Sequence, residues 1–242
     1  MLRPKATLSQ RAVLIGKFPL FAGVAQTDCA AILSLAYERS YSRREKIFFE
    51  RDPVTQVILL VAGCVKEMQF SQNGGEVILR LDGPGDLVGP AWCSANGHYS
   101  AAQAIQPSSA FVWDADRFER SAMRFPALHR NTARILDERL AAMQQRFREV
   151  STDTAASRLS NELLRLLNQM GQQVNGHIQI NLSREELAQL TATSPFTVSR
   201  LLSKWEELGI VTAQRELVLV RNLSALAGVA QSESRSTVRP SE

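Results

Sequence analysis

The chain contains little cysteine and little histidine. Its 242 residues include three residues of each type. Cys29, Cys64 and Cys93 are far apart and form no CxxC pair, which argues against a disulfide framework, a cysteine-only zinc site and an iron–sulfur cluster. We therefore expect the cysteines to be small buried hydrophobic residues.

Long apolar runs and catalytic signatures are also missing. No apolar run approaches the length of a membrane-spanning helix, and the N-terminal stretch MLRPKATLSQRAVLIGKF lacks the features of a signal peptide. The sequence has no Walker-type glycine loop, no GxSxG and no HExxH. We expect a cytoplasmic protein that does not contact membranes and is not an enzyme.

The charge of the chain indicates an acidic partner only weakly. The formal net charge is +4 and the pI is about 9.2. Residues 151–222 contain as many acidic as basic side chains, so their net charge is zero. An argument for nucleic-acid binding must therefore rest on how the side chains are arranged.

The N-terminal half changes from helical to β-type patterning. Residues 17–37 have helical periodicity, whereas residues 46–114 read as short strands separated by turn residues. Asn73-Gly74 lies between two alternating runs and predicts a hairpin. We expect residues 17–125 to form a small antiparallel barrel or roll with flanking helices.

A long helix is predicted over residues 126–150, beginning at Pro126. Its apolar residues recur at spacings of three and four, as in a coiled-coil seam. The helix could pack along its own barrel, but Leu128 and Ile135 supply a separate flank for that contact, so we favour a homodimer. The seam consists of Ala133, Leu136, Leu140, Met143 and Phe147.

The C-terminal part divides into a folded segment and a tail. Ser151 to Thr154 break the helical pattern and are expected to form a hinge, with Asp153 or Thr154 capping the next helix. We place a domain at residues 151–222. Residues 223–242 become polar and are expected to be disordered.

The folded C-terminal segment carries a helix-turn-helix pattern. Ser183 with Glu186 three residues later is a capping box for the first helix. Ser194 and Pro195 are favourable residues for the start of the second helix. The residues after this helix read as two short strands around a turn near Gln214, as in a wing.

The second helix has two faces. We expect an apolar stripe to hold the helix on its domain, formed by Val198, Leu201, Leu202, Trp205 and Leu208. We expect the other face to read DNA bases through Phe196, Ser199, Arg200 and Ser203, because arginine can bind a guanine edge and an aromatic ring can pack on a thymine methyl. Contacts to DNA phosphates are expected from Arg184, Thr197 and Lys204.

These residues resemble the Crp/Fnr superfamily of bacterial transcription regulators. The most specific part is REELAQLTATSPFTVSRLLSKWEELGIV, and LLVAGCVKEMQFSQNGGEVILRLDGPGDLVG is similar to the sensor barrel of the family. The resemblance implies an α+β fold with a cyclic-nucleotide-binding-type β-roll (a jelly-roll-like barrel), a long dimerisation helix and a C-terminal winged helix-turn-helix. It also implies a homodimer on double-stranded DNA with a two-fold symmetric operator.

Two departures concern the DNA-binding part. Family members usually have glycine where Ala192 stands, so this turn either avoids a left-handed backbone or is slightly strained. Phe196 stands where the family commonly has a base-reading glutamate, whereas Arg200 matches its reading arginine. Ser199 matches a base-reading position of the Fnr-like branch. We expect the operator to keep the guanine read by Arg200 and to lose a preference for cytosine.

The resemblance also identifies the phosphate-binding cassette of cyclic-AMP-responsive members. The residues that match its ribose-binding glutamate and phosphate-binding arginine are Pro90 and His98. Proline offers no side-chain acceptor and neutral histidine is a poor phosphate partner. We therefore expect no response to cyclic AMP.

The effector is left open by the sequence. Trp92, Cys93, His98 and Tyr99 stand where the family places its effector. Haem could bind with His98 or Cys93 as axial ligand and nitric oxide as the signal. Trp92 and Tyr99 could instead hold an aromatic small molecule, or these side chains could fill the barrel with no effector at all.

The resemblance makes RNA polymerase a partner and transcription activation the commoner outcome. A different class of protein remains possible, namely a cyclic-nucleotide-fold module that regulates a protein partner without binding DNA. Substitution of Arg200 distinguishes the two classes.

Overall fold

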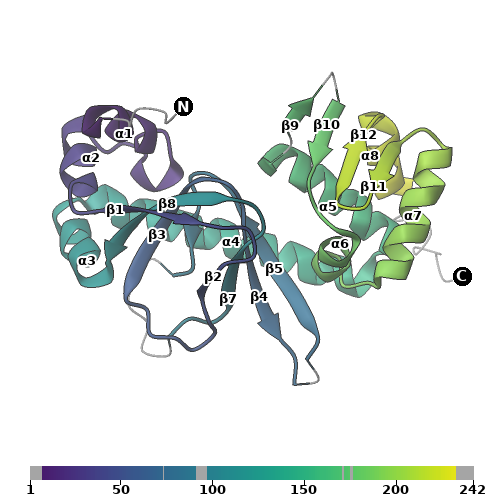
Figure 1. The fold of residues 1–242 in the computed structure, drawn as a ribbon, viewed down its shortest axis with the longest axis horizontal. Coiled ribbons are helices and arrows are strands. Elements are labelled where there is room, and N and C mark those ends of the chain that lie inside the picture. The colour runs from purple at the N-terminus through teal and green to yellow at the C-terminus, as the bar shows by residue number, and fades with distance from the viewer. Residues whose placement is uncertain (1–6, 73, 91–96, 171, 175–176, 233–242) are drawn as a thin grey trace, which may run out of the picture. The chain divides into compact units, whose positions relative to one another are not determined.

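Two compact units make up the chain in the computed structural model (Figure 1). The first comprises Met1–Gly75 and Leu79–Ala141, and the second comprises Glu76–Ile78 and Ala142–Glu242. The structure describes residues 7–72, 74–90, 97–170, 172–174 and 177–232. None of the helices in these ranges combines the length and hydropathy that a bilayer crossing would need.

Strands β1 to β8 form two four-stranded sheets. The strand orders are β1-β8-β3-β6 and β2-β7-β4-β5. Apolar residues from both sheets pack into one cluster, which includes Phe48, Leu60, Val88 and Ala104. The predicted β-roll is therefore confirmed, as two packed sheets instead of one closed barrel. The strands are Tyr37–Tyr41 (β1), Lys46–Phe48 (β2), Gln56–Ala62 (β3), Val65–Phe70 (β4), Glu76–Asp82 (β5), Leu87–Val88 (β6), Ala101–Ala104 (β7) and Ser108–Asp114 (β8).

The predicted hairpin joins β4 and β5, which are neighbours in their sheet. The Ser71 N–H donates to Gly75 O at 2.7 Å, and the Gly74 N–H donates to Ser71 O at 2.9 Å. Gly74 has φ +77°, a left-handed conformation that favours glycine. Asn73, the other predicted turn residue, lies outside the described residues.

Four short helices close one side of the roll around Trp113. The indole is fully buried, its centroid lies 5.4 Å from that of Phe118 and 6.4 Å from that of Phe21, and its Nε1 donates to Ile32 O at 2.8 Å. The sequence places this tryptophan at the end of a strand, so it packs directly against the flanking helices. The helices are Leu8–Ile15 (α1), Pro19–Phe21 (η1), Gln26–Leu33 (α2) and Ala115–Arg124 (α3).

Two predicted boundaries in the N-terminal region differ from the structure. The first domain does not begin at Lys17, because Ala12 and Ile15 of α1 are buried in the same core as Trp113. The helical patterning does not extend to Tyr37, which begins β1 and pairs with Val112. Thr7 supplies a capping box for α1 together with Gln10, a start signal that the sequence analysis missed.

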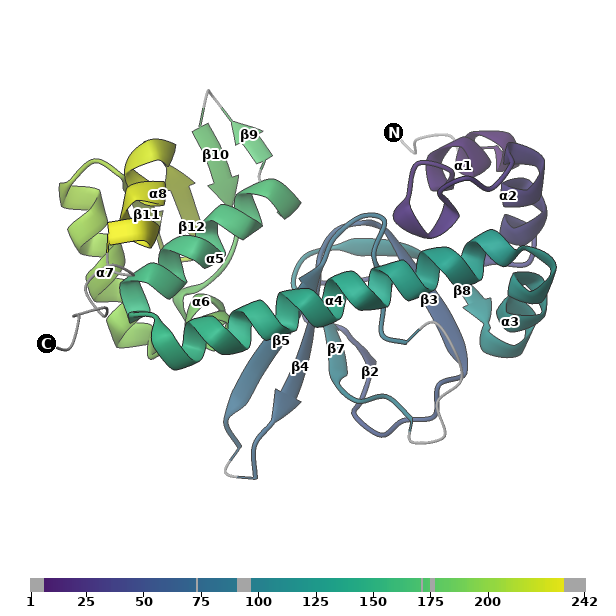
Figure 2. The same ribbon diagram turned by 180° about the vertical axis from the view of Figure 1, so that it is seen from behind.

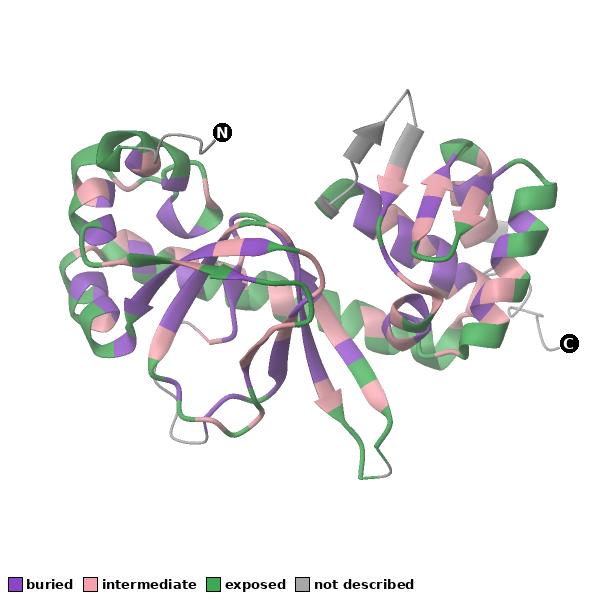
Figure 3. Cartoon of the chain, viewed as in Figure 1, coloured by how far each residue is buried: buried purple, intermediate pink, exposed green. Residues whose placement is uncertain are grey.

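Helix α4 runs from Pro126 to Thr152 as one continuous element (Figure 2), two residues beyond its predicted end. Leu128 is fully buried and Ile135 packs against the same core, which confirms the flank expected to face the roll. The seam residues are all exposed, and Figure 3 shows long exposed stretches along this helix. Their exposed fractions are 47% for Leu136, 56% for Leu140, 56% for Met143 and 75% for Phe147.

The second unit contains a four-stranded antiparallel sheet of order β11-β12-β10-β9 together with helices α5 to α8. Thr154 caps α5, because its Oγ1 accepts from the Ser157 N–H at 3.2 Å. Ser151 and Thr152, which we expected in a hinge, form the last turn of α4. The elements are Ala155–Met170 (α5), Gln172–Val174 (β9), His177–Ile180 (β10), Arg184–Leu190 (α6), Pro195–Glu207 (α7), Val211–Gln214 (β11), Leu217–Val220 (β12) and Leu223–Ser232 (α8).

We expected residues 223–242 to be disordered, and this was wrong for the first ten of them, which form α8. Leu226 is fully buried, and its carbonyl accepts from Ser160 Oγ at 2.5 Å. The Ala225 N–H donates to Asn222 Oδ1 at 3.0 Å, so Asn222 acts as an N-cap. The small residues around Leu226 lie against α5. Residues 233–242 lie outside the described residues.

Two of the three cysteines belong to the described residues. Cys29 and Cys64 are buried, as expected. Burial raises the pKa of the Cys29 thiol, and the charge of Asp28 adds to this effect. Cys93 lies outside the described residues.

Candidate functional site

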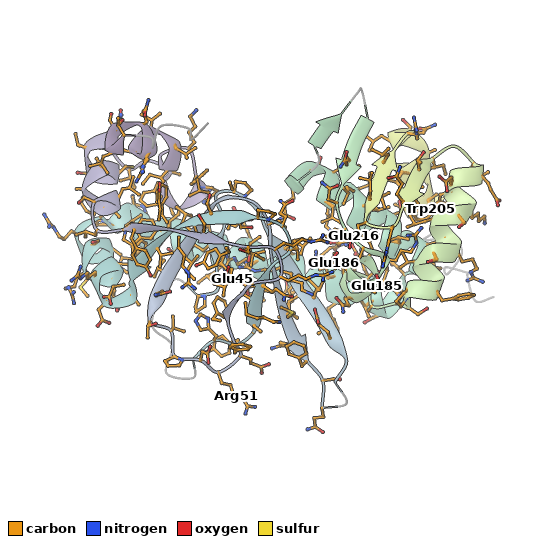
Figure 4. The ribbon with its side chains drawn as sticks, in the orientation of Figure 1. Glu45, Arg51, Glu185, Glu186, Trp205 and Glu216 are labelled. Atoms are coloured by element: carbon orange, nitrogen blue, oxygen red, sulfur yellow. The ribbon has the colours of Figure 1, made fainter. Side chains whose placement is uncertain are left out.

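The start of the helix-turn-helix is fixed by local hydrogen bonds. Ser183 Oγ accepts from the Glu186 N–H at 3.1 Å, and Glu186 Oε2 accepts from the Ser183 N–H at 2.8 Å. This is the predicted capping box, and it satisfies two N–H groups that the first turn of α6 leaves unpaired. Figure 4 labels Glu186 at this position. Leu187 and Ala188 then face the core and are buried.

The turn between α6 and α7 has a left-handed residue at Ala192, with φ +49°. Of the two possibilities for this position, the strained turn is therefore the one observed, at a cost of about 1 kcal/mol relative to glycine. Thr191 helps to hold the turn, because its buried Oγ1 donates to Leu187 O at 2.7 Å. The Thr193 N–H donates to Ala188 O at 3.0 Å.

Arg158 of α5, which is not among the predicted site residues, also holds this turn. Its Nε donates to Thr191 O at 2.8 Å and its Nη2 donates to Ala192 O at 3.2 Å. Its Nη1 donates to Asp153 O at 2.8 Å, beside the end of α4. One guanidinium thus joins the segment after α4 to the turn before α7. No sequence signal could have revealed this, because the acceptors are backbone carbonyls, and those of Thr191 and Ala192 are more than thirty residues away.

We expect Arg158→Ala to lower the free energy of unfolding by about 1.5 to 3 kcal/mol, the range for losing hydrogen bonds to a charged group. Urea denaturation of the full chain measures this loss. Arg158→Lys should recover only part of it, because one ammonium cannot reach three carbonyls in the geometry of a planar fork. Equal stability of the wild type and the alanine variant would contradict the structural role of Arg158.

Helix α7 begins and packs as its sequence predicts. Ser194 Oγ accepts from the Thr197 N–H at 3.1 Å, and Pro195 occupies the first turn. Val198, Leu202 and Trp205 are buried, with exposed fractions of 0%, 1% and 3%. Figure 4 labels Trp205 on this helix, and Figure 3 shows buried and exposed stretches alternating along it.

Two members of the expected stripe are less buried. Leu201 is half-buried, and Leu208 is 63% exposed, so its assignment to the buried stripe was wrong. Leu208 is the C-cap residue of α7, where the helix ends and the chain turns through Gly209, whose φ is +69°. The helical spacing that places Leu208 on the stripe no longer applies there.

The opposite face of α7 carries the residues expected to read DNA bases. Phe196 is 78% exposed, Arg200 and Ser203 are exposed, and Ser199 is half-buried. An exposed phenylalanine beside an exposed arginine is a surface that can contact both apolar and hydrogen-bonding groups of a ligand. All four residues belong to the helix that Val198, Leu202 and Trp205 anchor from the other side.

The three residues expected near phosphates differ in their environments. Lys204 is exposed in the last turn of α7. Thr197 is half-buried, and its Oγ1 lies 3.0 Å from Ser194 Oγ. Arg184 is half-buried and its Nη1 donates to Gln214 O at 3.0 Å. Arg184 therefore ties α6 to the wing.

The predicted wing is present as the antiparallel pair β11 and β12. Gln214 is the last residue of β11, as expected, and pairs with Leu217 across the turn. Glu206 of α7 braces the wing because its Oε1 accepts from the Ala213 N–H at 3.3 Å. Helix α7 and the wing therefore form one connected surface.

A buried ion-pair network joins the end of α4 to α5. Glu162 Oε1 accepts from Arg146 Nη2 at 2.8 Å, and Glu162 Oε2 accepts from Arg165 Nη2 at 2.7 Å. Arg165 also binds both carboxylate oxygens of Glu149, at 2.8 and 2.9 Å. Burial alone would raise the pKa of Glu149, but the hydrogen bonds and charge of Arg165 outweigh burial and lower it. The network holds the last turns of α4 on α5.

The residues expected to line an effector site are only partly described. Trp92 and Cys93 lie outside the described residues, Pro90 is half-buried and Tyr99 is 62% exposed. His98 is 5% exposed. Tyr99 contributes its carbonyl to the fold, where it accepts from Gln69 Nε2 at 2.7 Å. The described residues therefore do not place an aromatic cage around a common space.

His98 is packed as a structural residue. Its ring stacks on Phe48 with a centroid distance of 3.6 Å and an interplanar angle of 14°. Burial lowers its pKa despite the negative charges of Glu67 and Asp52, so the ring is neutral at neutral pH. Stacking on Phe48 covers one face of the ring, and a haem ligated by His98 would need this packing to change. The described residues also contain no group of three or more histidine, cysteine, aspartate or glutamate side chains that could hold a metal ion.

Comparison with known proteins identifies both parts of the chain. The family model of the Crp-like helix-turn-helix domain matches residues 157–229, and the model of the cyclic nucleotide-binding domain matches residues 38–125. The first match includes most of α8, in agreement with its packing on α5.

Similar proteins cover nearly the whole chain. It is 31% identical over 214 residues to the cyclic AMP receptor protein of Thermus thermophilus, covering 88% of this chain and 96% of that protein. It is 26% identical over 196 residues to the transcriptional activator protein Anr of Pseudomonas protegens, covering 78% and 80%. The fold is similar to the solved structure of FixK2 from Bradyrhizobium japonicum, with a TM-score of 0.73, 24% identity, and 81% and 98% coverage.

Proposed function

The chain belongs to the Crp/Fnr superfamily of transcription regulators, and on this premise we propose that it binds a two-fold symmetric DNA operator as a homodimer and does not respond to cyclic AMP. The observation that carries the DNA-binding proposal is the two-faced packing of α7. Val198, Leu202 and Trp205 fix the helix in the second unit, while Phe196 and Arg200 are exposed on it. This is the arrangement that a major-groove recognition helix needs.

The proposed base contacts follow from the chemistry of each side chain. Arg200 binds the O6 and N7 atoms of a guanine, and Phe196 packs on a thymine methyl. Ser199 and Ser203 supply hydroxyl groups that donate to or accept from neighbouring bases. Phe196 cannot accept the hydrogen bond that a cytosine amino group would donate to a glutamate. The operator therefore keeps the guanine read by Arg200 and has no cytosine preference imposed at Phe196.

Arg200→Ala tests the proposed DNA contact. We expect each half-site to lose about 1 to 3 kcal/mol of binding free energy, which is roughly 5- to 150-fold in Kd for each half-site, with relaxed specificity at one base pair. The two half-sites of the operator multiply this factor. An operator is first obtained by selection from random duplexes, and fluorescence anisotropy then measures binding to it. Because Arg200 is exposed, the variant should fold and assemble as the wild type does.

Lys204→Ala is the matched control for a phosphate contact. It should weaken binding to all sequences equally and reduce the slope of log Kd against log salt by about one per site. If Arg200→Ala binds the selected operator as tightly as the wild type, the groove assignment is wrong. If the wild type selects no sequence, the alternative function, a module that regulates a protein partner without DNA, is favoured.

The homodimer is proposed from the apolar seam of α4. Leu136, Leu140, Met143 and Phe147 are all nearly half exposed or more, and they share one side of the helix because their spacings are four, three and four. A second copy of the same helix covers this surface by coiled-coil packing. Dimer symmetry then presents two copies of α7 to two half-sites of the operator.

The absence of a cyclic AMP response is proposed from two residues of the cassette. Pro90 has no side-chain acceptor for a ribose hydroxyl, and His98 is neutral, buried and stacked on Phe48. Neither residue can replace a carboxylate or a guanidinium. We further propose that the regulator contacts RNA polymerase and activates transcription, as the resemblance to the family implies, and that it has no enzymatic activity.

A further inference from the structure

Glu67 of β4 is a buried carboxylate whose two oxygen atoms are both hydrogen-bonded. The residue is 7% exposed. Its Oε1 accepts from Arg80 Nη2 and from the Gly89 N–H, both at 2.6 Å. Its Oε2 accepts from Ser100 Oγ at 3.0 Å. The three donors come from β5, from the residue after β6 and from the residue before β7, so Glu67 joins three segments of the roll.

This donor set is of the kind that proteins use to bind anions. A guanidinium, a hydroxyl group and a backbone N–H converge on one point, as they do around bound phosphates and carboxylates. The backbone at Gly89 has φ +79°, and a Cβ there would lie 2.9 Å from Phe48 Cζ, so glycine is required for this N–H to reach the carboxylate. Burial alone would raise the pKa of Glu67, but Arg80 and Gly89 lower it to about 2, so the group is ionised at neutral pH.

The same segment of the roll is also held by α4. Arg139 donates through Nη2 to Leu87 O at 2.5 Å and through Nη1 to Gly89 O at 3.2 Å. Arg80 also donates to Leu87 O, at 2.8 Å, and pairs with the buried Asp82 at 2.9 Å. Residues 87–89 therefore lie between the Glu67 carboxylate and the guanidinium of α4.

We infer that Glu67 is a built-in anionic ligand of the roll, which occupies a cradle for a small phosphate or carboxylate anion and holds residues 87–89 against Arg139 without an external effector. Arg80 Nη2, the Gly89 N–H and the Ser100 hydroxyl group already bind Glu67, and a second anion there would lie beside a buried negative charge. The inference rests on the proposed function only where it treats α4, which carries Arg139, as a dimer helix. One possibility left open by the sequence is that the roll has no effector, and the Glu67 carboxylate is a physical cause for that absence.

The test uses the full-length protein and its Glu67→Ala variant, with sodium phosphate, sodium formate and cyclic AMP as probes. Melting temperatures are measured at constant ionic strength set with sodium chloride. The wild type should show no saturable shift with any of the three. The alanine variant should melt at a lower temperature and be stabilised saturably by phosphate or formate, by about 3 °C at ten times the Kd.

Ser100→Ala in the Glu67→Ala background is the matched control, because it removes one donor of the emptied cradle. It should weaken the anion effect severalfold. Isothermal titration calorimetry of the wild type with cyclic AMP is a second measurement, and it needs no variant. Saturable binding by the wild type, or an alanine variant that responds to none of the anions beyond chloride, would overturn the inference.

The melting temperature and the calorimetric titration are both measured without DNA. Failure of this inference can therefore be distinguished from failure of the DNA-binding proposal, which Arg200→Ala tests. If cyclic AMP alone stabilises the alanine variant, the emptied cradle takes the phosphodiester of a nucleotide and needs the rest of that ligand. If phosphate or formate suffices, the cradle takes a simple anion, and Glu67 acts as a carboxylate in its place.

Discussion

Replacing both Leu140 and Phe147 by aspartate is expected to convert the dimer to a folded monomer. In the proposed coiled coil these residues are buried by the second copy, although they are 56% and 75% exposed in the single chain. A buried carboxylate without a partner costs about 3 kcal/mol or more. We therefore expect the dissociation constant of the dimer to rise by more than about 100-fold, which sedimentation equilibrium measures.

Gln144→Asp is the control, because it places one carboxylate at an exposed position of α4 that is not among the seam residues. This variant should remain a dimer. Circular dichroism and thermal melting should show that the double variant is folded, because neither Leu140 nor Phe147 contributes to the core of the single chain. If the double variant sediments as a dimer, α4 is not the interface.

The loss of the dimer has a consequence for DNA binding. A monomer presents one recognition helix, so it gains only the binding free energy of one half-site. The second half-site of a dimer binds as an intramolecular event, at an effective concentration that is in the millimolar range for short connections. We therefore expect the double variant to bind a full operator hardly better than a half-site.

Much of the DNA-binding surface could be predicted from the sequence because its determinants are local. A capping side chain and the N–H that donates to it lie three residues apart in Ser183–Glu186 and Ser194–Thr197, so the sequence pattern contains both partners. The buried side of α7 follows from helical spacing at Val198, Leu202 and Trp205. The spacing failed at Leu208 because the helix ends there.

The groups that hold these elements together could not be predicted in the same way. Arg158 bonds to carbonyl groups of Thr191 and Ala192, and any residue could supply such groups. Glu67 likewise meets donors that are 13, 22 and 33 residues away. In the sequence it is one acidic residue in a β-type run, where alternation alone would allow it to be exposed.

The terminal helices illustrate a different limit. Helix α8 was missed although Asn222 is a good N-cap and the residues around Leu226 are small and apolar. Its stability comes from packing against α5, as is usual for short helices. The polarity of residues 233–242 shifted the interpretation of the preceding segment towards disorder.

Glu162→Ala is expected to destabilise the second unit more than any exposed substitution in it. The Glu162 side chain is fully buried and carries the charge that Arg146 and Arg165 share. Its removal takes from Arg146 and Arg165 the carboxylate that both bind. The cost of breaking a buried ion pair in this way is about 3 to 5 kcal/mol, and the lower value is expected because Arg146 and Arg165 are 23% and 34% exposed.

Urea denaturation followed by the fluorescence of Trp205 reports this loss most directly, because Trp205 is buried in the same unit. Trp113, which the core of the first unit needs, is the same in the variant and the wild type, so a difference between their transitions reports the second unit. Glu207→Ala, at an exposed position of α7, should change stability by less than about 0.5 kcal/mol. Glu162→Gln separates charge from packing: it keeps the size of the side chain, so stability close to that of the wild type would show that the arginines do not need the carboxylate.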